Sequence, residues 1–105
     1  MLISKKMIAV AKKAGACRAA IVWANEAPRK VSDLPFGYVD WTVEHLLQRR
    51  ARAQYDRIQS AAWNKYLDIF DKSTWKKLQQ ASWDKYKRSK LHALETGLAM
   101  QFPDS

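Results

Sequence analysis

The sequence predicts an all-α protein: two short N-terminal helices, a connector, and a long helical segment that folds back as a hairpin. Two observations support this prediction. The 105 residues include no glycine or proline between positions 38 and 96, and apolar residues recur at helical intervals through most of the chain. A hydrophobic fraction of 48% is too high for a disordered chain, and the length favours one domain, residues 1–105.

The N-terminal part of the chain, residues 1–26, predicts a pair of short helices. Ser4 is a suitable N-cap for the first helix, and Gly15 suits its end. The apolar side of this helix carries Ile3, Met7, Val10 and Ala14. A second helix is expected from Ala16 to about Glu26. One face of the second helix carries Cys17, Ala20, Ile21 and Ala24.

Residues 27–37 hold two prolines and a glycine and form the predicted connector. The long helical segment is expected over residues 38–97, with Asp40 as the N-cap of a helix that begins at Trp41. Its apolar stripe is regular: Val43, Leu47, Ala51, Tyr55, Ile58, Ala62, Tyr66 and Ile69. Matched residues recur every 11 positions, close to three helical turns, so the stripe stays on one side of a nearly straight helix.

The stripe ends after Phe70, where residues 71–74 offer Asp71 and Ser73 as new N-caps. A second stripe follows, through Trp75, Leu78, Ser82, Tyr86 and Ala93. Gly97 is expected to end this helix and to leave residues 98–105 as a tail. Two alternatives remain at 71–74. A turn there lets two long helices share their apolar sides, whereas an unbroken rod needs a second chain to cover its stripe.

The chain is strongly basic, with 19 Lys and Arg against 10 Asp and Glu. A net charge of +9 favours an anionic partner: nucleic acid, an acidic protein surface or an anionic membrane. Arginines cluster at the start of the long segment, and arginine prefers two-pronged contacts with carboxylate or phosphate. The candidate partner-binding residues are Arg49, Arg50, Arg52, Arg57, Lys76, Lys77, Lys85, Lys87, Arg88 and Lys90.

Aromatic residues are interleaved with the lysines of the long segment. The unit Trp63-Asn-Lys-Tyr66 recurs as Trp83-Asp-Lys-Tyr86. Such aromatics can stack on nucleic-acid bases or contact a protein partner. Residues three apart on a helix share a face, so the interpretation favoured here is that each Trp packs beside its Tyr inside the protein.

Catalytic and metal-binding patterns are poorly supported. Cys17, His45 and His92 do not have the spacing of metal ligands. Glu44 and His45 could act as an acid–base pair, but no nucleophile or phosphate-binding loop accompanies them. We therefore expect a protein that is not an enzyme and uses no cofactor or metal. Cys17 is interpreted as a small packed side chain.

Two segments resemble a group of small phage and prophage proteins. The first is GACRAAIVWANE followed by DWTVEHLL, and the second is RAQYDRIQSAAWNKY, which is similar to their 11-residue Ala-x-x-Tyr-Asp-Arg-Ile units. The resemblance covers roughly residues 14–66. It implies a mobile-element accessory protein.

We expect function by binding, in the cytoplasm of a host cell, by a monomer or homodimer without a membrane partner. The longest uninterrupted apolar run, AAIVWA, is much too short to span a bilayer. The leading hypothesis is a phage-type protein that binds a host macromolecular complex and blocks it, with host nucleases and CRISPR–Cas effectors as targets that the resemblance suggests. Direct binding of DNA or RNA is the first alternative, and an oligomeric helical rod is the second.

Overall fold

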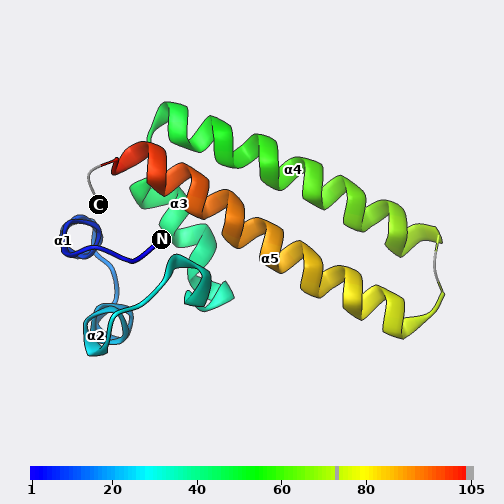
Figure 1. Ribbon diagram of the computed structural model, residues 1–105, viewed down its shortest axis with the longest axis horizontal. Coiled ribbons are helices and arrows are strands. Elements are labelled where there is room, and N and C mark those ends of the chain that lie inside the picture. The colour runs from blue at the N-terminus through cyan, green and yellow to red at the C-terminus, as the bar shows by residue number, and fades with distance from the viewer. Residues whose placement is uncertain (73, 104–105) are drawn as a thin grey trace.

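The computed structural model describes residues 1–72 and 74–103, and over these residues the all-α prediction is confirmed. The α-helices are α1 (Lys5–Lys13), α2 (Arg18–Glu26), α3 (Val39–Leu46), α4 (Arg49–Lys72) and α5 (Lys76–Gln101). Two short 3₁₀ turns, η1 (Val31–Asp33) and η2 (Phe36–Tyr38), lie in and just beyond the predicted connector. Figure 1 shows α4 and α5 as an antiparallel pair, with the smaller elements gathered at the end that holds the C-terminus.

The two long helices form the predicted hairpin because their apolar stripes face each other. Helix α4 has 24 residues and α5 has 26, so each is about 36–39 Å long. Ala51 and Tyr55 of α4 are buried, as are Tyr86 and Ala93 of α5. Towards the turn the stripe is only half-buried, at Tyr66 and Ile69 among others. Within the described part of the chain, α5 thus covers the seam fully near the start of α4 and only partly near the turn.

The turn between the long helices lies where the sequence places it. Helix α4 ends at Lys72 and α5 begins at Lys76, which excludes the unbroken rod. The predicted cap at Asp71 is wrong, because Asp71 lies in the last turn of α4. The alternative cap, Ser73, lies outside the described residues. The second stripe also begins later than predicted, because Trp75 and Leu78 are exposed and the buried positions start at Ser82.

A further break, which the sequence analysis did not predict, separates α3 from α4. Helix α3 begins at Val39 with Tyr38 at the N-cap position, so Asp40 lies in the first turn and is not a cap. The chain leaves helical geometry at Leu47, whose ψ is 126°. Leu47 is buried there, with its side chain against Gly97 of α5. Because α3 turns away from α4 at this point, it packs across α5 and closes the base of the hairpin (Figure 1).

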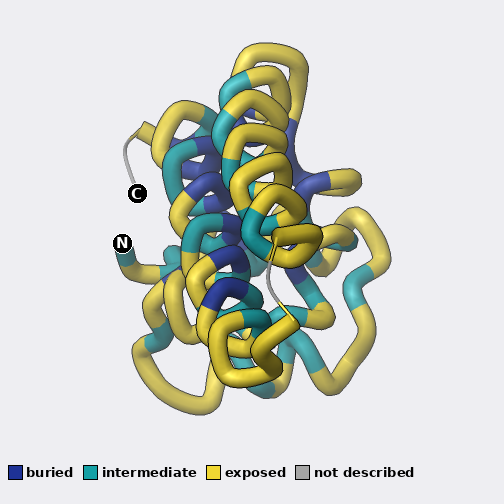
Figure 2. The backbone as a smooth tube through the Cα atoms, turned by 90° about the vertical axis from the view of Figure 1, so that its right-hand side faces the viewer, coloured by how far each residue is buried: buried dark blue, intermediate teal, exposed yellow. Residues whose placement is uncertain are grey.

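The hydrophobic core lies at this base, where α5 is covered on two sides. Figure 2 shows the buried residues concentrated along the inner sides of the helices, with exposed residues around them. The buried residues of α5 here are Ala93, Leu94, Gly97 and Leu98. The prediction that Gly97 ends the helix is therefore wrong, because α5 continues to Gln101. Phe102, in the predicted tail, is also buried in this core.

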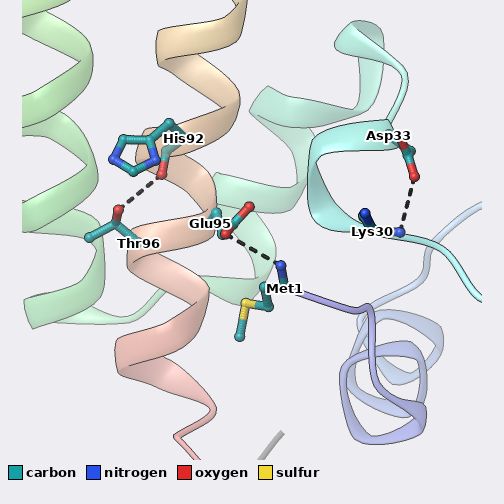
Figure 3. A network of polar contacts seen from close by, with 6 residues as sticks. All are labelled: Met1, Lys30, Asp33, His92, Glu95 and Thr96. Carbon is teal, nitrogen blue, oxygen red and sulfur yellow. Dashed lines mark hydrogen bonds and ion pairs between the residues drawn. The ribbon is translucent and has the colours of Figure 1, made fainter.

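The N-terminal segment is tied to the rest by backbone and polar contacts. Ser4 caps α1 as predicted, because its hydroxyl accepts from the Met7 amide at 3.2 Å. Gly15 directly follows Ala14, the C-cap of α1, and has a φ of +94°, a value that favours glycine. The Met1 amino group lies 3.4 Å from a Glu95 carboxylate oxygen of α5 (Figure 3). None of the residues of α2 is buried, whereas each of the other described α-helices has at least one buried residue.

Candidate interaction surface

The four arginines of α4 are all exposed, as recognition requires. Arg50 and Arg57 are seven residues apart, close to two helical turns, and both lie about half a turn around the helix from the buried Tyr55. They therefore lie on the outer side of α4. Arg49 and Arg52 lie on the flank of the same helix. The four arginines, which are clustered in the sequence, thus lie on two sides of α4. Arg50 and Arg57 are the pair on its outer side.

These arginines are not neutralised by the protein's own carboxylates. In the part of the chain that the structure describes, no ion pair involves any arginine of α4. Arg57 donates a hydrogen bond to the neutral Gln54 side chain. By contrast, Arg29 pairs with Glu26 and Lys72 pairs with Asp68. The α4 arginines therefore keep their full charge available for an external anion.

The lysines and the arginine of α5 differ in what they contact. Lys76, Lys77, Lys85 and Arg88 are exposed. Lys87 is half-buried and lies 3.6 Å from Asp84. Lys90 cannot belong to an exposed recognition surface: it is only 9% exposed, its ammonium lies 2.7 Å from an Asp40 carboxylate oxygen, and it lies over the Phe36 ring at 5.2 Å. The buried position of Lys90 follows from the packing of α3 and η2 across α5.

The register of the hairpin decides which cations come together. Gln59 of α4 donates to the Tyr86 hydroxyl of α5 at 2.7 Å. In an antiparallel pair this contact places Arg57 at the level of Arg88. Lys76 and Lys77 lie roughly 16–18 Å further along α5, near the turn. Arg57 and Arg88 thus share a level along the hairpin, but each lies about half a turn around its helix from the tyrosine at the seam. They therefore lie on opposite outer sides of the hairpin, and the predicted residues are not gathered into one pocket.

Each Trp of the repeated Trp-x-x-Tyr unit packs beside its Tyr as predicted, but Trp63 is 37% exposed, so its predicted place inside the protein is wrong. Ring centroids are 5.4 Å apart for Trp63 and Tyr66, and 5.5 Å apart for Trp83 and Tyr86. The two units also meet across the hairpin, with Tyr66 at 5.4 Å from Trp83. Phe36 of η2 meets the edge of Trp83 at 5.8 Å, a contact that no local sequence pattern indicated. These aromatics therefore stabilise the hairpin by offset and edge contacts.

No known protein family, curated protein or solved structure matches this chain. The resemblance to phage proteins consequently stays a prediction.

His45 and Cys17 lie outside the α4–α5 hairpin, on α3 and just before α2. The His45 ring stacks on Trp41 at 4.4 Å, and its Nδ1 lies 2.9 Å from the Trp41 carbonyl oxygen. Cys17 is exposed, so its interpretation as a packed side chain is wrong. Over residues 1–72 and 74–103, no three His, Cys, Asp or Glu side chains lie together as a metal-binding group. Over the same residues, even the long α4 and α5 lack a stretch apolar enough to cross a bilayer.

Proposed function

We propose that the protein is a non-enzymatic, phage-type accessory protein that binds a host macromolecular complex through the outer cationic surface of its α4–α5 hairpin. One observation carries the proposal: the exposed arginines of α4 have no carboxylate partner, whereas the apolar side of the same helix is covered by α5. The helix thus uses its apolar side for folding and offers guanidinium groups outward.

Arginine supports a specific kind of partner. Its planar fork makes paired hydrogen bonds to carboxylate or phosphate, so an acidic protein surface and bound nucleic acid are both suitable. A host nucleoprotein complex carries both chemistries. Host nucleases and defence complexes, CRISPR–Cas effectors among them, are the target class that the phage resemblance suggests. Binding there would block or redirect the complex.

Direct binding of nucleic acid is the second candidate, and the position of Arg50 and Arg57, two turns apart on the outer side of α4 without a carboxylate partner, favours it. Two cations spaced along one side of a helix suit the spaced charges of a phosphate backbone. The two candidates differ in their dependence on salt, because a protein that neutralises several phosphates loses affinity log-linearly as salt rises. The oligomeric rod is less favoured, because α4 and α5 pack their apolar sides against each other within one chain.

The test compares two charge-matched double variants. Arg50→Glu with Arg57→Glu, and Lys5→Glu with Lys6→Glu, each change the net charge from +9 to +5, because each replaces two positive charges by two negative ones. Tagged forms are used to capture complexes from bacterial lysate, and fluorescence anisotropy measures their binding to a labelled generic duplex over a salt series.

We expect the wild-type protein and the Lys5/Lys6 variant to capture the same dominant complex, and the Arg50/Arg57 variant to lose it at least tenfold. Generic duplex should bind weakly and without discrimination between the two variants. Equal capture by both variants would contradict the assignment to α4. Tight duplex binding with a steep salt slope, lost only in the Arg50/Arg57 variant, would establish the nucleic-acid alternative in its place.

A further inference from the structure

A cavity of about 370 Å³ opens between the N-terminal helices and α3, away from the cationic hairpin surface. Small-molecule sites in proteins commonly have volumes of this order. Its lining comes from α1, α2, the connector, α3 and one residue of α5. No lining residue is charged: Ile3, Met7, Ile8, Ala11, Gly15, Ala16, Cys17, Ala20, Ile21, Trp23, Ala24, Val31, Leu34, Gly37, Tyr38, Trp41, Thr42, Leu46 and Leu98.

The cavity exists because α2 covers the core without packing into it. The predicted apolar face of α2 lines the cavity through Ala20, Ile21 and Ala24, yet no residue of this helix is buried. Opposite them, Met7 and Val31 belong to the buried core and are 2% and 1% exposed. Small alanine side chains on one wall and a closed apolar core on the other leave a space that apolar atoms would fill favourably.

The Thr42 hydroxyl in the lining does not need a hydrogen-bond partner from a ligand. The Thr42 hydroxyl donates to the Tyr38 carbonyl oxygen at 2.7 Å, so it is already satisfied. Trp23 of α2 and Trp41 of α3 contribute broad aromatic surfaces to the lining. The cavity interior therefore suits a flexible hydrocarbon chain, whose only favourable contacts are apolar.

Charge at the edge of the cavity is positive along α1 and at the start of α2, and the one acidic residue of α2, Glu26, lies at its far end and pairs with Arg29. The first 25 residues contain five lysines and arginines and no Asp or Glu. Three of them, Lys12, Lys13 and Arg18, flank lining residues 15–17 and are exposed. None of the three forms an ion pair within the described residues. An anion held at this edge would meet cations without competition from an acidic side chain of the same segment.

We propose that this cavity binds a free medium-chain carboxylate, with the hydrocarbon chain inside and the carboxylate directed towards Lys12, Lys13 and Arg18. The apolar lining selects the chain, and the one-sided charge at the edge selects an anionic head group over a neutral one. This ligand site is separate from the proposed interaction surface and does not depend on it.

Calorimetric titration of the full chain tests the proposal with decanoate, octanoate, hexanoate and decanol, all below their aggregation concentrations. Decanoate should bind at one molecule per chain. Affinity should fall roughly fourfold for each methylene removed, the ratio that corresponds to about 0.8 kcal/mol per buried CH₂. Decanol should bind at least tenfold more weakly than decanoate, because it has no charge to place beside the lysines and arginine.

Matched variants locate the ligand. Ala20→Phe fills the cavity and should weaken decanoate binding more than tenfold, whereas Ala81→Phe, at an exposed position on α5, should leave it unchanged. Lys13→Gln with Arg18→Gln should reduce decanoate affinity to that of decanol, and Lys5→Gln with Lys6→Gln should change it far less. Circular dichroism establishes that each variant keeps its helical content.

A measurement on the wild-type chain covers the case in which Ala20→Phe does not fold. Cys17 is the sole cysteine, is exposed and lies at the cavity, so a bimane attached to it reports on the local environment. Decanoate should shift the bimane emission saturably at the calorimetric affinity. Equal binding of decanol and decanoate would overturn the anionic assignment. An unchanged bimane signal would overturn the site, as would decanoate binding by a folded Ala20→Phe variant that equals wild-type binding. A ligand-free dimer that Ala20→Phe abolishes would show instead that the cavity binds a second copy of the chain.

Discussion

The Lys90 ammonium of α5 lies 2.7 Å from the Asp40 carboxylate of α3, and the two partners are buried to very different degrees. The Lys90 side chain is 11% exposed, whereas that of Asp40 is 83% exposed. Water therefore solvates one member of the pair and not the other. The contact joins α3 to α5 and withdraws Lys90 from the cationic outer surface.

This difference in burial predicts that removing the exposed Asp40 carboxylate lowers the free energy of unfolding more than removing the buried Lys90 ammonium does. Asp40→Ala leaves a buried ammonium without its carboxylate and should lower the free energy of unfolding by about 1–3 kcal/mol. Lys90→Met keeps the aliphatic stem and removes the buried charge, while Asp40 is solvated by water. Its cost should be below about 1 kcal/mol. Urea denaturation of both variants checks the order, and a larger loss for Lys90→Met would contradict it.

A close approach between helices makes Gly97 sensitive to a single methyl group. A Cβ at this position would lie 2.9 Å from Leu47 Cδ1 and 3.2 Å from the Ala51 carbonyl oxygen. In an open helix, Gly→Ala stabilises by about 1 kcal/mol. Here we expect Gly97→Ala to destabilise by about 1–2 kcal/mol, because Leu47 is buried and the Ala51 backbone cannot move independently of α4.

The control for Gly97 is Gly37→Ala, where an added Cβ meets no atom within 4 Å. Its unfolding midpoint in urea should not fall. Adding Gly97→Ala to a Leu47→Ala background should cost less than adding it to the wild type, because the smaller side chain frees the space. Additive costs in this double-mutant cycle would show that Leu47 is not what limits the approach.

The hairpin was predictable because the apolar residues that define it repeat at short, regular intervals along the sequence. Tyr55, Ile58, Ala62 and Tyr66 recur at intervals that hold one side of a helix, and the pattern fails where the turn occurs. Pairing Trp with Tyr three residues later also follows from helix geometry alone. These parts of the fold need no knowledge of distant contacts. The outward position of Arg50 and Arg57 follows in turn, since the opposite side of α4 is buried.

The break at Leu47 and the partners of Lys90 were not predictable, because both depend on how α3 crosses α5. Leu47 continues the helical stripe in sequence, and only its contact with Gly97 explains why the chain turns there. Lys90 lies four residues after Tyr86 and three before Ala93, so it falls on the predicted stripe, unlike the exposed Lys85 and Arg88. Nothing local indicates that Asp40 and Phe36 will cover it. The cavity beneath α2 escaped prediction for the same reason.

Truncation of Trp83 should lower the stability of the protein far more than truncation of Trp75. Trp83 is half-buried between Phe36, Tyr66 and Tyr86, so Trp83→Ala should destabilise the protein by about 2–4 kcal/mol. Trp75 is 68% exposed, and Trp75→Ala should change the free energy of unfolding by less than about 0.5 kcal/mol. Thermal and urea unfolding measure both. Similar losses for the two variants would contradict the packing interpretation of the repeated unit.

Alkaline pH should weaken the fold through Tyr55, which lies in the core at the base of the hairpin. Burial is the main cause that raises the pKa of Tyr55 above its ordinary value, and the nearby charge of Asp40 adds to it. In the unfolded chain the phenol titrates near pH 10. Below about pH 10 both states are protonated, so the stabilising contribution of neutral Tyr55 is fully present.

As pH rises above about 10, the unfolded state releases the Tyr55 proton while the folded state retains it, so stability falls by up to about 1.4 kcal/mol per pH unit. Tyr55→Phe removes this proton and should flatten the decline between about pH 10 and 12, at a cost of about 1 kcal/mol or less near neutrality. The matched control is Tyr38→Phe, at a half-buried position outside the hairpin. Urea midpoints across this pH range measure the slopes. Because burial makes the folded state retain the Tyr55 proton, the steeper decline should depend on Tyr55. Equal slopes for the wild type and Tyr55→Phe would show that other groups cause the alkaline loss of stability.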